Sequence, residues 1–130
     1  MKPGPKSGFL GARMRSFACA GRGVALLLRS QVNARIHLLA TVVVIAGGIG
    51  FGVTSGEWCL LAIAMGMVWS AEAANAALEQ LADRVNHEHD ERIGRAMDVA
   101  AGAVLLAAIA AAAVGFLVFG PRVWALLRGG

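Results

Sequence analysis

Four polar side chains, spaced as on one face of a helix, lie at the end of a long apolar stretch in this 130-residue sequence. They are Glu72, Asn75, Glu79 and Asp83, and we refer to them as the polar stripe. Spacings of three, four and four residues return almost to the same azimuth at about 100° per residue, so the four side chains point the same way. An ionisable group at membrane depth is costly and usually marks a functional site. We therefore expect the function to lie at this stripe.

The residue types of the stripe suit phosphate chemistry with a divalent cation. Two carboxylates on one helix face can divide the work: Glu72, deeper in the apolar stretch, would act as a base, and Glu79, nearer water, would hold a metal ion. An oxygen-only ligand set of Glu79 and Asn75, with Asp83 as a further candidate, favours magnesium over zinc. Magnesium usually arrives with substrate phosphates, so the stripe predicts a phosphate donor at a lipid–water boundary.

Each residue of the stripe also has a purely structural interpretation. Asn75 could form a hydrogen bond between helices, and Asp83 could cap or solvate the end of the helix. Glu72 could form a buried ion pair with an arginine of the preceding surface helix. The structural interpretation is weaker for Glu79, because three possible partners share its face.

A charged segment, residues 87–91, follows the stripe and reads His-Glu-His-Asp-Glu. It could hold zinc, but a solvated polar turn is the more common meaning of such a segment. Because the segment adjoins the stripe, we expect Glu88, His89 or Asp90 to contact a bound nucleotide. Asp98, expected at the start of the third apolar helix, would either favour the helix dipole or bind an adenine or ribose group.

Three long apolar segments must position these residues, and they explain a hydrophobic content of 58% and a mean hydropathy of +0.66. Each approaches the roughly 20 residues needed to cross a bilayer. Residues 99–119 contain no charge, which disfavours a soluble helical bundle. We predict an all-α fold of three transmembrane helices preceded by an amphipathic membrane-surface helix. The predicted divisions are a disordered segment 1–7, a domain 8–124 with a surface helix at about 8–30 and spans at about 34–53, 57–86 and 96–119, and a tail 125–130.

The basic residues indicate the orientation. Residues 1–35 contain seven lysines and arginines and no acidic residue, which predicts a multi-pass protein of the bacterial cytoplasmic (inner) membrane with its N-terminus inside. Nucleic-acid binding is an alternative for so basic a segment, but anionic lipid headgroups explain it more simply, and we expect no nucleic-acid partner.

The glycines, the alanines and Pro121 lead to further predictions about helix continuity, helix packing and the end of the third span. Apolar residues alternate with arginines over residues 8–30, which suits a helix on the inner membrane surface, although Gly21 and Gly23 would interrupt it and a solvated basic tail is the alternative. Glycines in the first span and alanines in the third favour close helix packing or oligomerisation. Pro121 is expected to end the third span.

Several motifs of this sequence resemble those of one family. Residues 72–83, Glu-Ala-Ala-Asn-Ala-Ala-Leu-Glu-Gln-Leu-Ala-Asp, resemble the E-x-x-N-[ST]-A-[IL]-E-x-x-x-D signature of the small bacterial lipid kinases, the prokaryotic diacylglycerol kinases and undecaprenol kinases. The similarity covers about residues 16–124, and no Walker A loop, G-x-G-x-x-G motif or protein-kinase signature is present. Further matches are Ser16-Phe17, Ala20-Gly-Arg-Gly23, Asn33-x-Arg35-Ile36-His37 and Ala96-Met-Asp98-Val-Ala-Ala-Gly-Ala103-Val.

The resemblance implies a homotrimer that transfers the γ-phosphate of Mg·ATP to the hydroxyl of a membrane lipid alcohol, diacylglycerol or undecaprenol. It makes Glu72 the general base and Glu79 a ligand of the magnesium ion. Asn75 would orient groups in the site, and Asp98 would contact the nucleotide. Residues 33–37 and the Ala-Gly-Ala-Val segment, residues 101–104, look more like the undecaprenol kinase branch than the diacylglycerol kinase branch.

Three positions depart from the family pattern. Gln31 stands where a glutamate is usually the second metal ligand, and Met97 stands where a lysine usually precedes the aspartate at Asp98. Ala76 replaces a usual serine or threonine. These departures favour reduced activity or, as an alternative function, a non-catalytic membrane assembly subunit of the same fold. A third interpretation is an ion-conducting helical protein with Glu72 as the carrier group, although a pore needs no phosphate-facing cluster.

Overall fold

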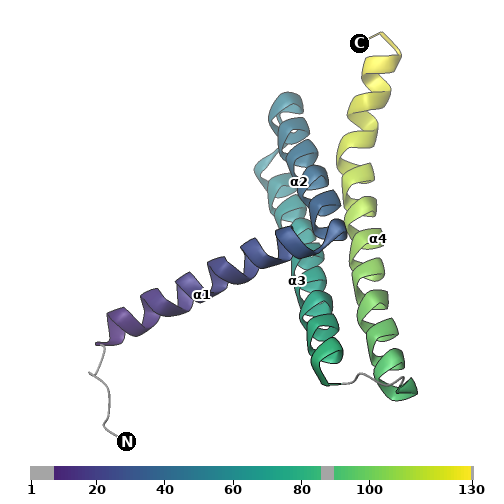
Figure 1. Ribbon diagram of the computed structural model, residues 1–130. Coiled ribbons are helices and arrows are strands. Elements are labelled where there is room, and N and C mark those ends of the chain that lie inside the picture. The colour runs from purple at the N-terminus through teal and green to yellow at the C-terminus, as the bar shows by residue number, and fades with distance from the viewer. Residues whose placement is uncertain (1–7, 86–89, 130) are drawn as a thin grey trace, which may run out of the picture.

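The computed structural model describes residues 8–85 and 90–129, and within these residues it contains four α-helices and no strand. The helices are α1 (Phe9–Ser30), α2 (Val32–Phe51), α3 (Ser55–Val85) and α4 (Glu91–Leu127). Figure 1 shows α2, α3 and α4 side by side as a bundle, while α1 leaves the bundle at a steep angle. The predicted all-α fold is confirmed, and α2, α3 and α4 are each long and apolar enough to cross a membrane.

The first helix, α1, runs without interruption through Gly21 and Gly23, so the break that would favour the alternative of a solvated tail is not found. A glycine inside a helix costs only about 1 kcal/mol relative to alanine, which the flanking helix-forming residues tolerate. Leu27 is the buried residue of α1. It packs in a small core with Ala34 of α2 and Ala76 of α3, so the end of α1 is fixed against the bundle.

Arg35 fixes the corner between α1 and α2. The chain turns at Gln31, whose backbone is extended at φ −111° and ψ 122°. Nε and Nη2 of Arg35 donate to the carbonyl oxygens of Leu28 and Arg29, at 3.1 and 2.8 Å. These carbonyls belong to the last turn of α1 and have no partner within the helix. The guanidinium therefore holds the corner in place, and with it the position of Gln31.

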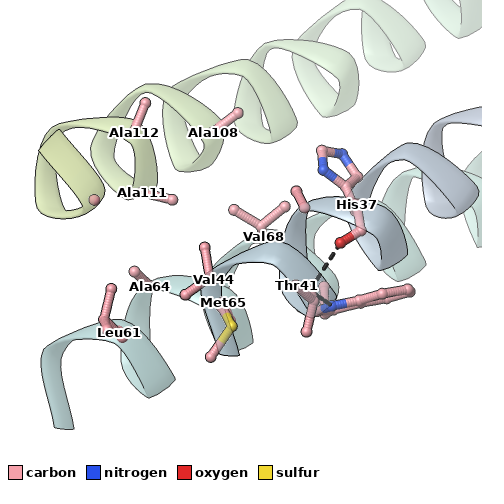
Figure 2. A pocket seen from close by; sticks show the side chains of 13 residues that line it. His37, Thr41, Val44, Leu61, Ala64, Met65, Val68, Ala108, Ala111 and Ala112 are labelled. Carbon is pink, nitrogen blue, oxygen red and sulfur yellow. Dashed lines mark hydrogen bonds between the residues drawn. The ribbon is translucent and has the colours of Figure 1, made fainter. Parts of the chain in front are cut away.

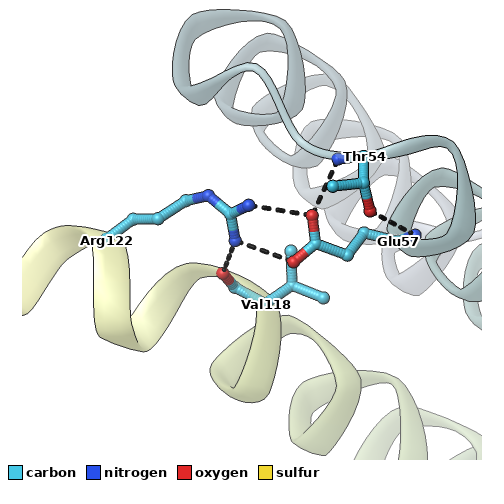
Figure 3. A network of polar contacts seen from close by, with 4 residues as sticks. All are labelled: Thr54, Glu57, Val118 and Arg122. Atoms are coloured by element: carbon cyan, nitrogen blue, oxygen red, sulfur yellow. Dashed lines mark hydrogen bonds and ion pairs between the residues drawn. The ribbon is translucent and has the colours of Figure 1, made fainter.

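A polar network joins the ends of α3 and α4 that lie farthest from the polar stripe (Figure 3). The Thr54 N–H donates to Oε2 of Glu57 at 2.8 Å, and the Glu57 N–H donates to Oγ1 of Thr54 at 3.3 Å. This reciprocal pair is a capping box, which begins α3. The same carboxylate accepts two hydrogen bonds of 2.9 and 2.8 Å from Arg122 of α4. One glutamate thus both starts α3 and attaches it to α4.

Pro121 does not end the last helix, because α4 continues to Leu127 and the expected end is wrong. A proline removes one helical hydrogen-bond donor, and the helix survives where neighbouring groups stabilise the turn. Here Nη1 of Arg122, itself held by Glu57, donates to the carbonyl of Val118 at 2.6 Å. This bond stabilises the turn that contains the proline.

Close packing of α2 on α3 depends on Gly48. This glycine is buried, and a Cβ atom built there would collide with the indole ring of Trp58. Beside it lies a second core, formed by Val53, Leu61 and Val118. The close helix packing predicted for the glycine-rich span is therefore found within a single chain.

Candidate functional site

Burial of the polar stripe decreases along α3. Glu72 is 1% exposed and Asn75 is 7% exposed. Glu79 is half-buried, and Asp83 is exposed near the end of the helix. Three of the four side chains therefore lie inside the structure, whereas Asp83 lies where solvent can hydrate it.

Glu79 is the centre of a small cluster with Asn75 and Gln31, which we call the amide–carboxylate cluster. Nδ2 of Asn75 donates to Oε1 of Glu79, and Nε2 of Gln31 donates to Oε2, each at 2.9 Å. Gln31 reaches α3 because it is the residue at which the chain turns from α1 to α2. Sequence reasoning identified Gln31 only as a departure from a pattern, and the structure places it in contact with Glu79.

The amide–carboxylate cluster has ligands of the kind that magnesium prefers. Each amide carries a carbonyl oxygen as well as its NH₂ group, so a half-turn of the amide presents an oxygen instead. Glu79 contributes the negative charge of the three residues. Among the described residues no three His, Cys, Asp or Glu side chains come together to hold a metal ion. The three side chains offer fewer oxygens than an octahedral magnesium ion takes, so an ion held here would need further ligands.

Glu72 faces a histidine. Its Oε2 atom is buried and has no hydrogen-bond partner among the described residues. Nε2 of His37, on α2, lies 3.9 Å from this oxygen. In the part of the chain that is described, the basic group beside Glu72 is thus a histidine of α2, and the alternative of a buried ion pair with an arginine of α1 is not found. A buried carboxylate oxygen without a donor is costly, and it marks a place where a ligand could donate a hydrogen bond.

A cavity of about 300 Å³ between α2, α3 and α4 begins at His37 (Figure 2). Its hydrogen-bonding side chains are His37, Thr41 and Trp69. Nε1 of Trp69 donates to Oγ1 of Thr41 at 3.0 Å, and Oγ1 donates to the backbone carbonyl of His37 at 2.7 Å. The rest of the lining is aliphatic or small, and α4 contributes only alanines and Gly115. The cavity therefore suits an amphiphile with one polar end.

Sequence reasoning missed this cavity and the importance of His37. In the sequence, His37 stands out only as part of the motif of residues 33–37, and Thr41 and Trp69 lie within apolar stretches. A usable signal was present, since a histidine in the first two turns of an apolar helix needs a polar neighbour on another helix.

Asp90 caps the last helix. Its Oδ1 accepts a hydrogen bond of 2.8 Å from the backbone N–H of Arg92, which satisfies one of the free donors at the start of α4. The other two residues expected to contact a nucleotide from this segment, Glu88 and His89, lie outside the described residues.

Asp98 does not lie at the start of α4. The helix begins at Glu91, so Asp98 is two turns inside it and exposed, and the expected position is wrong. Within the residues described, no hydrogen bond or ion pair connects it to the amide–carboxylate cluster. Its neighbour Met97 is partly buried and lines a shallow apolar cavity with Leu78 and Ala82 of α3.

A family model described as prokaryotic diacylglycerol kinase matches residues 18–119 of the sequence. The chain belongs to the prokaryotic diacylglycerol kinase family. The resemblance predicted from the motifs is confirmed, and so is the prediction of a lipid kinase. Every residue of the site, from Gln31 to Asp98, falls inside the part of the chain that matches this family.

Two relatives within the prokaryotic diacylglycerol kinase family align with most of the chain. The undecaprenol kinase of Bacillus subtilis is 32% identical over 108 residues, which cover 83% of this chain and 88% of that protein. The diacylglycerol kinase of Synechocystis is 37% identical over 113 residues, which cover 86% of this chain and 65% of that protein. The two relatives are named for different lipid alcohols.

Proposed function

We propose that this protein transfers the γ-phosphate of Mg·ATP to the hydroxyl of a membrane lipid alcohol, diacylglycerol or undecaprenol. The observation that carries the proposal is the buried Oε2 atom of Glu72, which has no hydrogen-bond donor among the described residues. It lies 3.9 Å from Nε2 of His37, a residue that lines the amphiphilic cavity. Family membership supports the class of reaction. The arrangement of α2, α3 and α4 supports a lipid site whose polar end meets Glu72.

In the proposed reaction Glu72 is the general base. The lipid hydroxyl donates a hydrogen bond to Oε2, and its proton moves to this oxygen as the lipid oxygen attacks the γ-phosphorus. The new oxygen–phosphorus bond forms while the bond to the β–γ bridging oxygen breaks, and ADP leaves with that electron pair. Because Glu72 is only 1% exposed, water is kept from the reacting hydroxyl.

The amide–carboxylate cluster is proposed to hold the magnesium ion that accompanies ATP. Glu79 would bind it through a carboxylate oxygen, and Asn75 and Gln31 would turn their amide oxygens towards it. When bound, the ion neutralises negative charge on the transferred phosphate. Gln31 contributes an oxygen but no charge, so we expect weaker magnesium binding than two carboxylates would give.

The nucleotide is proposed to lie along the same end of the bundle, where α3 ends and α4 begins. Asp98 remains the candidate for contact with the adenine or ribose. Asp90, together with Glu88 and His89, is proposed to contact the nucleotide from the segment that precedes α4.

We further propose a homotrimer in the bacterial inner membrane with the N-terminus and the site on the cytoplasmic side. In the most apolar 18 residues of α2 and of α4, only 11% are buried within one chain, so lipid or other copies of the chain must cover the exposed apolar surface. The exposed arginines of α1, and its exposed apolar residues such as Phe9 and Phe17, support a helix on the membrane surface.

The proposal is tested by incorporation of labelled phosphate from ATP into lipid. Purified protein in phospholipid vesicles receives either diacylglycerol or undecaprenol, with and without Mg²⁺. We expect Mg²⁺-dependent incorporation that falls at least about 100-fold in Glu72→Gln and Glu72→Ala. Gln80→Ala is the control on the same helix, because Gln80 is exposed and lies outside the polar stripe, and it should retain most activity. Wild-type rates no better than those of Glu72→Ala with both alcohols would refute the kinase function.

A second candidate function, the non-catalytic assembly subunit, is favoured by the Gln31–Glu79 hydrogen bond, which occupies the carboxylate proposed to bind metal. The same assay separates the two candidates. A wild type without activity, combined with activity gained in a Gln31→Glu, Met97→Lys double variant, would support the assembly subunit.

A further inference from the structure

His37 faces Glu72 at a distance that one oxygen atom, lying to one side and hydrogen-bonded to both, could bridge. Nε2 of His37 and Oε2 of Glu72 are 3.9 Å apart. Nitrogen–oxygen hydrogen bonds are about 2.7–3.2 Å long, so the two atoms are near each other without being bonded. An oxygen atom about 2.8 Å from each of them closes the gap with an angle of about 90°.

The two side chains differ in their access to the cavity. The Glu72 side chain is 1% exposed, whereas the His37 side chain is 19% exposed and lines the cavity. A molecule that enters the cavity therefore meets the imidazole first and the carboxylate oxygen behind it. Of the lining residues, Thr41 and Trp69 are already bonded to each other, which leaves the imidazole as the unbonded polar group of the lining.

Apart from Glu72 and the bonded pair of Thr41 and Trp69, the described groups around His37 are apolar. Glu72 is the charged group that faces it from α3. The lining residues of α4 are alanines and Gly115, and α1 contributes Leu27 and Leu28 to the neighbouring core. A hydrogen bond made at this place competes with little solvent, which strengthens it.

We propose that His37 and Glu72 form a hydroxyl-binding pair, in which Nε2–H of His37 donates to the lipid oxygen while that oxygen donates its proton to Oε2 of Glu72. The inference rests on the proposed kinase function and deepens it by adding a second substrate-contacting residue. His37 must carry its hydrogen on Nε2 to act in this way.

With this pair in place, each of the two bonds and two lone pairs of the lipid oxygen has a defined role. Its carbon bond leads into the cavity, its O–H bond points to Glu72, and one lone pair accepts from His37. The second lone pair forms the bond to the γ-phosphorus, while the phosphorus–oxygen bond to ADP breaks and Glu72 keeps the proton until water removes it. As the O–H bond breaks, negative charge grows on the lipid oxygen, and the His37 donor stabilises that charge.

The first test compares His37→Leu with His37→Gln, whose amide restores a donor. We expect His37→Leu to lower kcat about 10- to 100-fold with an unchanged KM for ATP, and His37→Gln to recover most of this loss. Wild-type activity in His37→Leu, or an equal loss in the two variants, would overturn the pair while leaving the kinase function intact.

The second test needs no turnover. Trp58→Phe and Trp124→Phe leave Trp69, which lines the cavity, as the fluorescent reporter. Titration with dioctanoylglycerol should show binding about 5- to 10-fold weaker in His37→Leu than in the parent protein. The methyl ether of the same lipid, which cannot donate to Glu72, should also bind more weakly to the parent. Equal affinity of parent and His37→Leu for the alcohol would refute the pair, whatever the outcome for phosphorylation.

Discussion

Replacing Gln31 by glutamate tests the amide–carboxylate cluster most directly. The wild-type amide donates to Oε2 of Glu79 over 2.9 Å. A carboxylate in its place cannot donate, and two like charges about 4 Å apart repel by ~1 kcal/mol in water and by ~4 kcal/mol at an effective dielectric constant of 20. Because Glu79 is half-buried, we expect Gln31→Glu without divalent cations to lower the free energy of unfolding by about 1–3 kcal/mol.

Magnesium should reverse this loss. The cluster of the variant carries two negative charges, so we expect Mg²⁺ to bind about 10- to 100-fold more tightly, which corresponds to about 1.4–2.8 kcal/mol. The measurement is the melting temperature in vesicles over a titration with MgCl₂, with and without ATP, combined with the Mg²⁺ dependence of phosphorylation. Gln31→Ala is the matched control, because it removes the hydrogen bond without adding a charge.

The outcome is decisive in either direction. A larger stabilisation by MgCl₂ in Gln31→Glu than in wild type and Gln31→Ala would support a shared cation between residues 31 and 79. If MgCl₂ raises the melting temperature equally in all three proteins, these two side chains do not share a cation, and the proposed metal site is wrong.

Three other substitutions have outcomes that follow from the packing. Met97→Lys should raise activity much less than Gln31→Glu, because Met97 packs against α3 and a lysine would have to leave those contacts. A large fall in the KM for ATP in Met97→Lys would contradict this prediction. In chemical unfolding, Gly48→Ala should destabilise the protein by about 1–3 kcal/mol, because the added methyl group collides with the indole ring of Trp58. Gly50→Ala is the control and should leave the stability nearly unchanged, because the space around Gly50 is open. Arg122→Met should lower the melting temperature by a few degrees without changing the KM for ATP, and an altered KM would show that the network at the far end of α3 and α4 affects the site.

The elements of this fold could be predicted from sequence because each one is visible within a short window. The apolar runs indicated the helices, and the spacing of the polar stripe indicated that Glu72, Asn75 and Glu79 share one face. The hydrogen bond between Asn75 and Glu79 follows from this spacing, since residues four apart are neighbours on a helix.

The contacts between helices could not be predicted in this way. Gln31 and Glu79 are 48 positions apart, and their hydrogen bond depends on the corner that Arg35 stabilises. The same holds for His37 and Glu72, which meet only because α2 packs against α3. Pro121 misled the prediction for a related reason, because the bond that stabilises its turn comes from a side chain held by another helix.

Glu72 and Glu79 lie on one uninterrupted helix, so α3 itself sets the distance between the two carboxylates. Glu79 follows Glu72 by seven positions, which is about 10 Å along the helix axis. Loops usually adjust such distances in soluble enzymes, but here the backbone hydrogen bonds of α3 set the distance. An insertion of one residue between the two would rotate them about 100° apart, so the spacing can change only by nearly whole turns. The helix therefore restricts the distance between the proposed proton acceptor and the proposed cation site to values that differ by about one helical turn.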